Sequence, residues 1–207
     1  VPSVIMVAIG SVMNYFLNLI LYSFSKLAVA VFGAYFKVQS MAFMPVFGLN
    51  NGMIPIISYN YGAQKPDRMK RTMKLGVMVG CSIMVFCLAI MQVFPGQILK
   101  IFDATDEMLL MGIPAVRIMS TAFIFAGFSV TCSGMFQAVG KGVYSMIVSM
   151  ARQLFVILPV AYFLSKAMNS VNGVWAAFPI AEVFSVIIST IFLLRVYKKI
   201  VKPMESV

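Results

Sequence analysis

Long apolar stretches without a charged residue alternate with short charged segments along this chain. No Asp, Glu, Lys or Arg occurs in residues 1–25, 38–64, 75–99 or 118–140. A helix needs about 20 mainly apolar residues to cross the hydrocarbon core of a bilayer, and each of these stretches is long enough. The pattern therefore predicts an all-α integral membrane protein, because helices satisfy their own backbone hydrogen bonds in lipid.

Charge gaps and helix-breaking residues divide the chain into six predicted spans. The spans are expected at about residues 1–25, 34–60, 73–94, 110–138, 143–165 and 172–194. The fifth should be broken at Pro159, since a proline ring clashes with the preceding helical turn. We expect a basic cytoplasmic loop at 62–72 and a cytoplasmic tail at 195–207. The predicted fold is a six-transmembrane-helix bundle that forms a single lobe over 1–207.

The overall composition supports a membrane protein. Of 207 residues, 61% are hydrophobic and 11% are charged, and the mean hydropathy is +0.97. A soluble fold of this size could not bury so much apolar surface. The net charge of +10 would suit nucleic-acid binding, but the basic residues stand beside apolar spans, where they meet lipid headgroups. We therefore expect the lipid bilayer, and no nucleic acid, as a partner.

Basic residues are concentrated at one side of the predicted membrane. Ten lie on one side: Lys65, Arg68, Lys70, Arg71, Lys74, Lys141, Arg195, Lys198, Lys199 and Lys202. Three lie on the other: Lys26, Lys100 and Lys166. Because Lys and Arg favour the cytoplasmic side, we expect a multi-pass protein of the plasma membrane with both chain ends in the cytoplasm. The chain starts at Val1 inside an apolar run, so we also expect it to be a fragment.

The residues needed for most enzyme chemistry are missing. The chain has no His, and its three Cys residues lie within apolar spans, where we expect them to stay reduced. No Cys/His cluster has the spacing of metal ligands, and the glycines around Lys141 do not form a phosphate-binding loop. The sequence therefore predicts neither an enzyme nor a bound metal or cofactor.

Polar residues form a stripe on each of the first two predicted spans. Those of the first span recur every three or four residues and so share one helix face: Ser11, Asn14, Asn18, Tyr22 and Ser25. Those of the second span include Lys37, Ser40 and Asn51. Such groups either line a water-accessible pathway or hydrogen-bond neighbouring helices together. The first interpretation makes Asn14, Asn18, Lys37, Ser40 and Asn51 candidate pathway residues.

Two charged residues within the last two predicted spans are expected to meet. Glu182 lies 13 residues before Arg195, or roughly 20 Å of helix, and Arg152 lies 11 residues after Lys141, or roughly 17 Å. Because these spans run antiparallel, the two charges stand at similar depth. They either form a structural ion pair, or Glu182 exchanges a proton or binds a cation.

A proline–glycine pattern in the second predicted span leads into Tyr59-Asn60-Tyr61-Gly62-Ala63. With this segment, the chain resembles the multidrug and toxic compound extrusion (MATE) family of transporters, and specifically the C-terminal lobe of the bacterial multidrug pumps. The likeness rests on three stretches, Phe43–Ala63, Gly134–Gly142 and Gly173–Glu182, and continues through Lys65, Arg68 and Lys70.

The resemblance implies one half of a twelve-helix transporter made of two six-helix lobes. Such transporters exchange small amphipathic cations for Na⁺ or H⁺, which would be the coupling ion here. Some branches use acids in the first and fourth helices of this lobe, but the first predicted span has none and the fourth offers Arg117. The coupling acid is therefore expected in the N-terminal lobe, with Glu182 as the local candidate.

Three functions stay open at this point. The first is multidrug efflux by antiport, with an N-terminal lobe or a second copy of the chain as the partner. The second is a flippase for lipid-linked precursors from the same superfamily, in which a cavity ring of Arg or Lys is expected. The third is a membrane subunit that transports nothing and uses its polar stripes to bind a partner.

Overall fold

The computed structural model describes residues 2–205, with side chains from residue 4 onward. Nearly all of this part of the chain is helical. The α-helices are α1 (Pro2–Tyr22), α2 (Lys26–Gly62), α3 (Pro66–Val93), α4 (Pro95–Ile101), α5 (Asp106–Ser120), α6 (Phe123–Ala138), α7 (Gly142–Met150), α8 (Leu158–Ala167), α9 (Asn172–Val196) and α10 (Lys202–Met204). Two π-helical segments, η1 (Ala151–Ile157) and η2 (Tyr197–Val201), connect α7 to α8 and α9 to α10.

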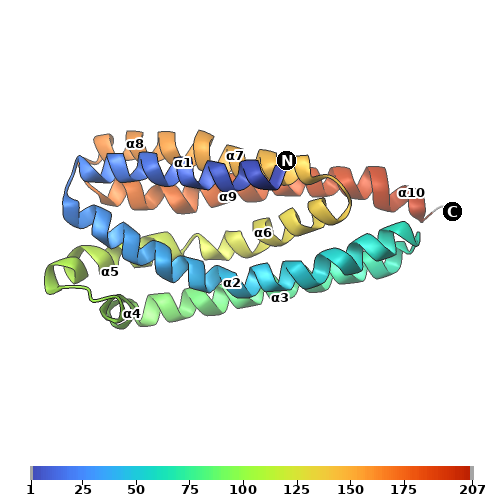
Figure 1. Cartoon of the computed structure of the whole chain (residues 1–207), viewed down its shortest axis with the longest axis horizontal. Coiled ribbons are helices and arrows are strands. Elements are labelled where there is room, and N and C mark those ends of the chain that lie inside the picture. Colours follow the sequence, from blue (N-terminus) through green and yellow to red (C-terminus); the bar gives the residue numbers. More distant parts are fainter. Residues whose placement is uncertain (1, 206–207) are drawn as a thin grey trace.

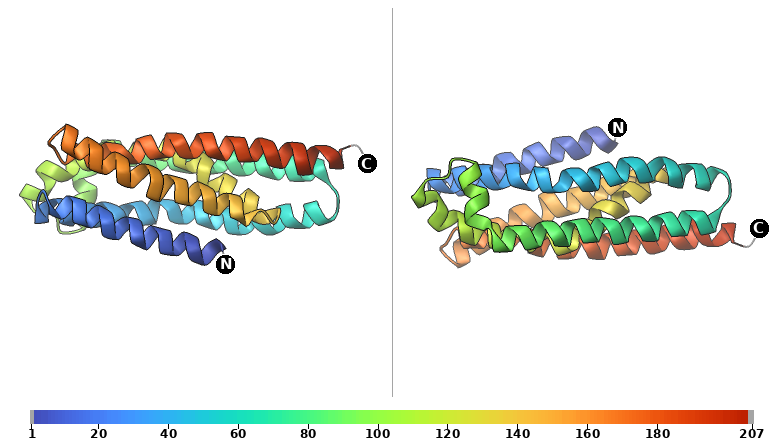
Figure 2. Two further views of the ribbon diagram at one scale, coloured as in Figure 1. Left: turned by 90° about the horizontal axis from the view of Figure 1, so that it is seen from above. Right: turned by 90° about the horizontal axis from the view of Figure 1, so that it is seen from below.

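The long helices run along the long axis of an elongated bundle (Figure 1). One side of the bundle contains α1, α7, α8 and α9, the other contains α2 and α3, and α6 crosses between them. Helix α1 packs on α7, η1 and α8, whereas α2 packs mainly on α3 and α6. The two helices therefore diverge from their short connection, as the views from above and below show (Figure 2).

The predicted fold class, an all-helical membrane bundle, is confirmed. Within the described residues, five helices are long and apolar enough to cross a membrane, and a sixth span results if α5 and α6 count as one. These two helices are bent by 50°, whereas the sequence predicted an unbroken span over 110–138. The fourth predicted span is therefore helical on both sides of its middle but is bent there.

Side chains satisfy the backbone where α5 meets α6. Gln92 of α3 donates from Nε2 to the carbonyl oxygen of Arg117 at 2.9 Å and to Ser120 Oγ at 3.1 Å. The hydroxyl of Thr121 donates to the carbonyl oxygen of Ile118 at 2.7 Å. A broken helix at membrane depth requires such partners, because lipid offers none to a freed carbonyl. Gln92 therefore stabilises the bend from a neighbouring helix.

Replacing Gln92 with leucine should destabilise the protein by about 1 kcal/mol, because the Arg117 carbonyl and the Ser120 hydroxyl lose a donor. A denaturant titration in detergent micelles would measure this. Gln97→Leu is the matched control, since Gln97 is exposed on α4 and such changes usually stay within about 0.5 kcal/mol. Equal stabilities of the two variants would contradict the role given to Gln92.

The structure also differs from the sequence prediction at three helix boundaries. Most of the predicted loop 62–72 is helical, since α3 starts at Pro66 with Asp67 in its first turn, and both residues favour a helix start. Most of the predicted tail 195–207 is helical as well and extends to Met204, because Val196 and Val201 are buried against the bundle. Pro159 does not break its span. It lies in the first turn of α8, directly after the wider π-helical turns of η1.

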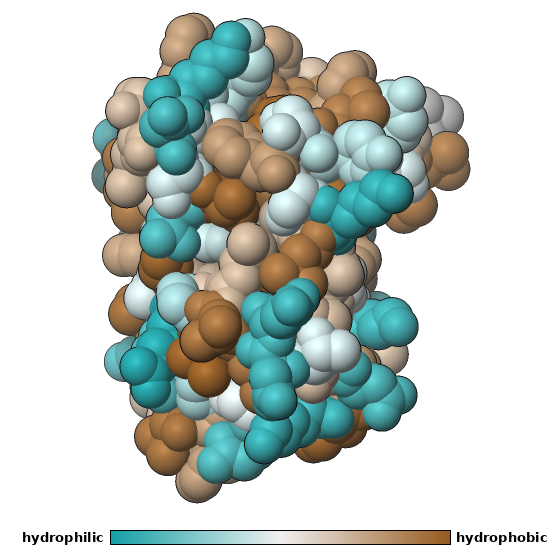
Figure 3. Space-filling model, turned by 90° about the vertical axis from the view of Figure 1, so that its left-hand side faces the viewer, coloured by the Kyte–Doolittle hydropathy of each residue, from teal (hydrophilic) through white to brown (hydrophobic). Residues whose placement is uncertain are grey.

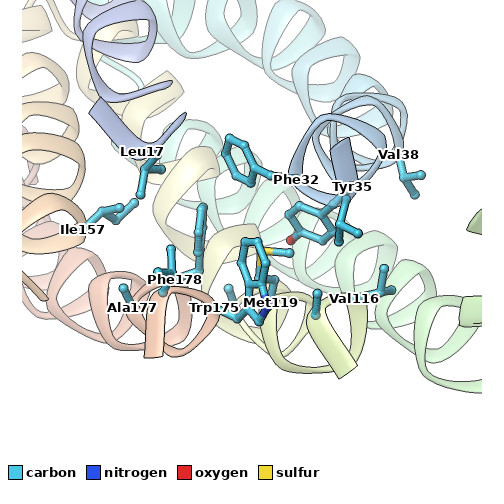
Figure 4. Packing of buried hydrophobic residues seen from close by; sticks show 14 of the residues in the cluster. Leu17, Phe32, Tyr35, Val38, Val116, Met119, Ile157, Trp175, Ala177 and Phe178 are labelled. Atoms are coloured by element: carbon cyan, nitrogen blue, oxygen red, sulfur yellow. The ribbon is translucent and has the colours of Figure 1, made fainter. Parts of the chain in front are cut away.

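Two apolar clusters form the core, one near each end of the bundle. The first lies toward the α1–α2 connection and includes Leu17, Tyr35, Trp175 and Phe178. Figure 4 shows aromatic and apolar side chains of α2, α5 and α9 converging in it. The second lies toward the α2–α3 connection and includes Phe136. Between the two clusters, α2, α6 and α9 carry buried polar residues.

Candidate functional site

A polar layer separates the two apolar clusters on several helices at once. On α2, Asn50 stands between Val46 of the first cluster and Met53 of the second. On α6, Ser129 occupies the corresponding place, and on α9 Glu182 and Ser185 do so. All four polar residues are at least nine-tenths buried. Polar groups at equal depth on facing helices indicate a shared site rather than isolated contacts.

A cavity of about 600 Å³ lies beside this layer. Helices α1, α2, α6, α7 and α9, together with η1, contribute its walls. Its polar lining residues are Asn14, Gln39, Ser40, Asn50, Asn51, Ser129, Ser133, Gln137, Ser149, Arg152, Gln153, Glu182 and Ser185. Its apolar lining includes Met13, Phe43, Phe47 and Phe178. An amphipathic molecule of drug size fits a cavity of this volume and mixed chemistry.

The charged part of the cavity is an ion pair. Arg152 Nη1 donates to Glu182 Oε1 at 2.7 Å, and the two side chains are 21% and 10% exposed. The contact uses one nitrogen and one oxygen, so Arg152 Nε and Glu182 Oε2 are buried without a hydrogen-bond partner among the described residues. Arg152 belongs to η1, and π-helical turns are frequent at functional sites. The pair makes the cavity nearly neutral.

Several other buried polar atoms around the cavity are unsatisfied. In the described part of the chain, Asn14 Oδ1, Asn50 Oδ1, Ser129 Oγ and Ser185 Oγ have no hydrogen-bond partner. Asn50 is held in place by its other end, since Nδ2 donates to the carbonyl oxygen of Val130 at 3.0 Å. A buried polar atom left unpaired costs about 1–3 kcal/mol. Atoms of this kind gathered at one cavity are ready to bind water or a polar guest.

The structure brings most of the predicted site residues together. Asn14, Ser40, Asn51, Arg152 and Glu182 all line the cavity. Two other predicted residues do not line the cavity.

The residues outside the cavity are Asn18 and Lys37. Asn18 lies one turn beyond Asn14 toward the α1–α2 connection, where Leu17 and Leu21 of the same helix are fully buried in the first cluster. Lys37 is an exposed residue of α2. The polar stripes are thus longer than the cavity that they enter.

Sequence reasoning missed the contribution of α6. Ser129, Ser133 and Gln137 are spaced four residues apart and all line the cavity. This spacing is a one-face helical stripe like those on the first two predicted spans, so the signal was present in the sequence. Ser185 likewise lies three residues after Glu182. Among the described residues, no group of three or more His, Cys, Asp or Glu side chains is placed to hold a metal ion.

Comparison with known proteins gives a consistent result. The model of the MatE family matches residues 2–163. The multidrug export protein MepA of Staphylococcus haemolyticus is 26% identical over 176 residues, which cover 85% of this chain and 38% of that protein. MepA of Staphylococcus aureus strain MSSA476 is 25% identical over 176 residues, with coverage of 85% and 39%. The chain therefore spans about two fifths of the length of these relatives.

Solved structures show the same fold. A MATE protein in its straight conformation aligns with a TM-score of 0.90 and 20% identity, covering 100% of this chain and 46% of that one. An outward-facing multidrug resistance MATE transporter aligns at 0.89 with 19% identity and coverage of 100% and 46%. An inward-facing one aligns at 0.88 with 19% identity and coverage of 99% and 47%. The chain thus has the fold of about half of such a transporter.

Proposed function

The chain belongs to the MatE family, and we propose that it forms the C-terminal half of an exporter for small amphipathic cations. The observation that carries this proposal is the cavity of about 600 Å³ with aromatic, amide and hydroxyl groups around one acid, Glu182. Phenylalanine side chains would bind the apolar part of a substrate, and Asn14, Ser40 and Asn51 would bind its polar part or its water. The multidrug exporters among the relatives support this substrate class.

Exchange for Na⁺ or H⁺ supplies the driving force. Moving one positive charge outward against an interior-negative potential costs about 2.3 kcal/mol per 100 mV. One-for-one exchange with an inward-moving cation removes this electrical cost. The coupling acid lies in the other half of the transporter or is Glu182, which must release Arg152 before it can bind another cation.

Movement of whole lobes accounts for alternating access. The fold resembles an outward-facing and an inward-facing transporter almost equally, with TM-scores of 0.89 and 0.88. This supports a half that keeps its shape while it moves against its partner, which is either an N-terminal lobe or a second copy. We assign Asn18 and Lys37 to the pathway in a state in which α1 and α2 stand further apart. In this arrangement, the basic end that holds the α2–α3 connection faces the cytoplasm, and so do both chain ends.

Gradient-driven transport in vesicles tests the function. We expect the assembled protein to move ethidium against its gradient when a Na⁺ or H⁺ gradient is imposed, and to stop when that gradient is collapsed. This chain reconstituted by itself should show no coupled transport, because one lobe supplies one wall of the pathway. Ethidium transport that depends on neither ion gradient would contradict antiport.

The same vesicles separate the alternatives. A flippase would move a fluorescent lipid-linked precursor and not ethidium. The pairing of Arg152 with Glu182 leaves the cavity without the excess of positive charge that an anionic lipid precursor requires. A non-transporting partner subunit would move neither compound. If Glu182→Gln retains coupled ethidium transport, the coupling acid lies in the other half.

A further inference from the structure

The end of the bundle at the α2–α3 connection carries an excess of positive charge that the protein does not neutralise. Its two acids, Asp67 and Glu205, both contact Lys70, with Nζ–Oδ1 and Nζ–Oε1 distances of 2.8 and 2.9 Å. Several other basic residues at this end are exposed and form no ion pair within the described part of the chain, and six of them lie on α3, η2 and α10: Arg68, Arg71, Lys74, Lys198, Lys199 and Lys202. We call these six residues the basic ridge.

The ion pair between Lys70 and Glu205 joins the two parts of the basic ridge. It connects the first turns of α3 to the residue directly after α10, although the two lie 135 positions apart in the sequence. Figures 1 and 2 show α10 beside the start of α3 in each view. The basic residues of α3 and those of η2 and α10 therefore stand at one end of the molecule as a single charged surface.

Each part of the basic ridge continues an exposed apolar helix surface. On α3, the basic residues are followed by Leu75 and Met78, which are 50% and 55% exposed. On α9, the exposed residues Ile187, Ile191 and Leu194 precede the basic residues of η2. Long basic side chains at such a boundary extend their charged ends to the headgroup level and keep their methylene groups against lipid tails. In a bilayer crossed by these apolar surfaces, the ridge would stand at the depth of lipid phosphates.

The opposite end of the bundle has no comparable excess. Its loops and helix ends carry Lys26, Lys100 and Lys166 together with Asp103, Asp106 and Glu107. Figure 3 looks onto this end, where hydrophilic side chains are interspersed with apolar ones. The two ends therefore differ in net charge as well as in the number of basic residues.

From this surface we infer that the basic ridge is a binding site for the headgroups of anionic phospholipids. The charge is complementary, and the adjoining apolar surfaces of α3 and α9 accommodate the acyl chains of the same lipids. A soluble acidic partner would match the charge without the adjoining apolar surface. The site is independent of what the cavity transports.

Electron spin resonance with spin-labelled lipids tests the inference in the assembled protein. We expect labelled phosphatidylglycerol to associate more strongly than labelled phosphatidylcholine at low ionic strength, and the preference to weaken with added salt. The variant Lys198→Gln/Lys199→Gln/Lys202→Gln should lower this preference several-fold. A single basic residue near an anionic surface contributes a factor of roughly five at most.

The matched control is Lys26→Gln/Lys100→Gln/Lys166→Gln, which removes the same charge from the opposite end. It should leave the preference for phosphatidylglycerol unchanged. The second ridge variant, Arg68→Gln/Arg71→Gln/Lys74→Gln, changes a different helix and should reproduce the loss even if the first variant folds poorly. Equal losses in ridge and control variants would show a general effect of net charge and overturn the inference. So would an unchanged preference in both ridge variants.

Discussion

Replacing Arg152 with methionine is expected to destabilise the protein by about 3 kcal/mol, one of the two largest effects that we predict for a single side chain. Methionine keeps much of the volume but leaves the Glu182 carboxylate buried without its partner. Removing one member of a buried ion pair costs about 3–5 kcal/mol, because the remaining charge has lost its hydration and has no opposite charge beside it. We expect the lower end of this range, because the Arg152 side chain is partly exposed.

The double variant Arg152→Met/Glu182→Met is the control for this prediction. Replacing both members of a buried pair with apolar side chains is often neutral or stabilising, so most of the lost stability should return. Denaturant titrations of the two single variants and the double variant measure the coupling between the positions. A double variant as unstable as Arg152→Met would show that the ion pair is not the cause.

The same double variant also separates the two roles open for Glu182. If the pair only holds η1 and α9 together, the double variant is stable and transports ethidium. If Glu182 exchanges a proton or binds a cation, the double variant is stable and loses coupled transport. Stability and transport are measured on one preparation, so a folding defect is not mistaken for a functional one.

Gly173→Ala is expected to cost about 3 kcal/mol or to prevent assembly. A Cβ at this position would lie 2.5 Å from the carbonyl carbon and oxygen of Leu164 and 2.7 Å from the backbone nitrogen of Ser165. These are backbone atoms of α8, so no side-chain rotation relieves the contact. The tight α8–α9 corner must open, and Val174 and Trp175, both fully buried in the first cluster, would move with it. Overpacking typically costs about 1–3 kcal/mol, and a clash with the backbone belongs at the upper end.

Gly33→Ala is the matched control for Gly173→Ala. Gly33 is an exposed residue in the interior of α2, and a Cβ there would have no neighbour within 4 Å. Alanine favours a helix interior over glycine by up to about 1 kcal/mol, so this variant should be as stable as the parent or slightly more stable. Thermal unfolding in detergent would compare the two. Equal midpoints for both variants would rule out a close α8–α9 contact.

The sequence by itself determined the fold class and the meeting of Arg152 with Glu182. Spans are readable because the length of an uncharged apolar run is set by the bilayer thickness. The ion pair is readable because depth along antiparallel neighbouring helices follows from counting residues. Both inferences use one dimension, the distance along a helix, which the sequence contains.

The tertiary structure decided what depends on which neighbour covers a helix face. Helical periodicity placed Asn14 and Asn18 on one face, but Asn14 lines the cavity and Asn18 does not, since one turn further on α1 packs Leu17 and Leu21 into the first cluster. The bend between α5 and α6 lies away from Pro114, the proline of α5, and is stabilised by Gln92 of another helix. The predicted tail is helical because Val196 and Val201 find a buried surface to pack against. A sequence gives the orientation of a side chain around its own helix, whereas the packing of the other helices decides what it meets.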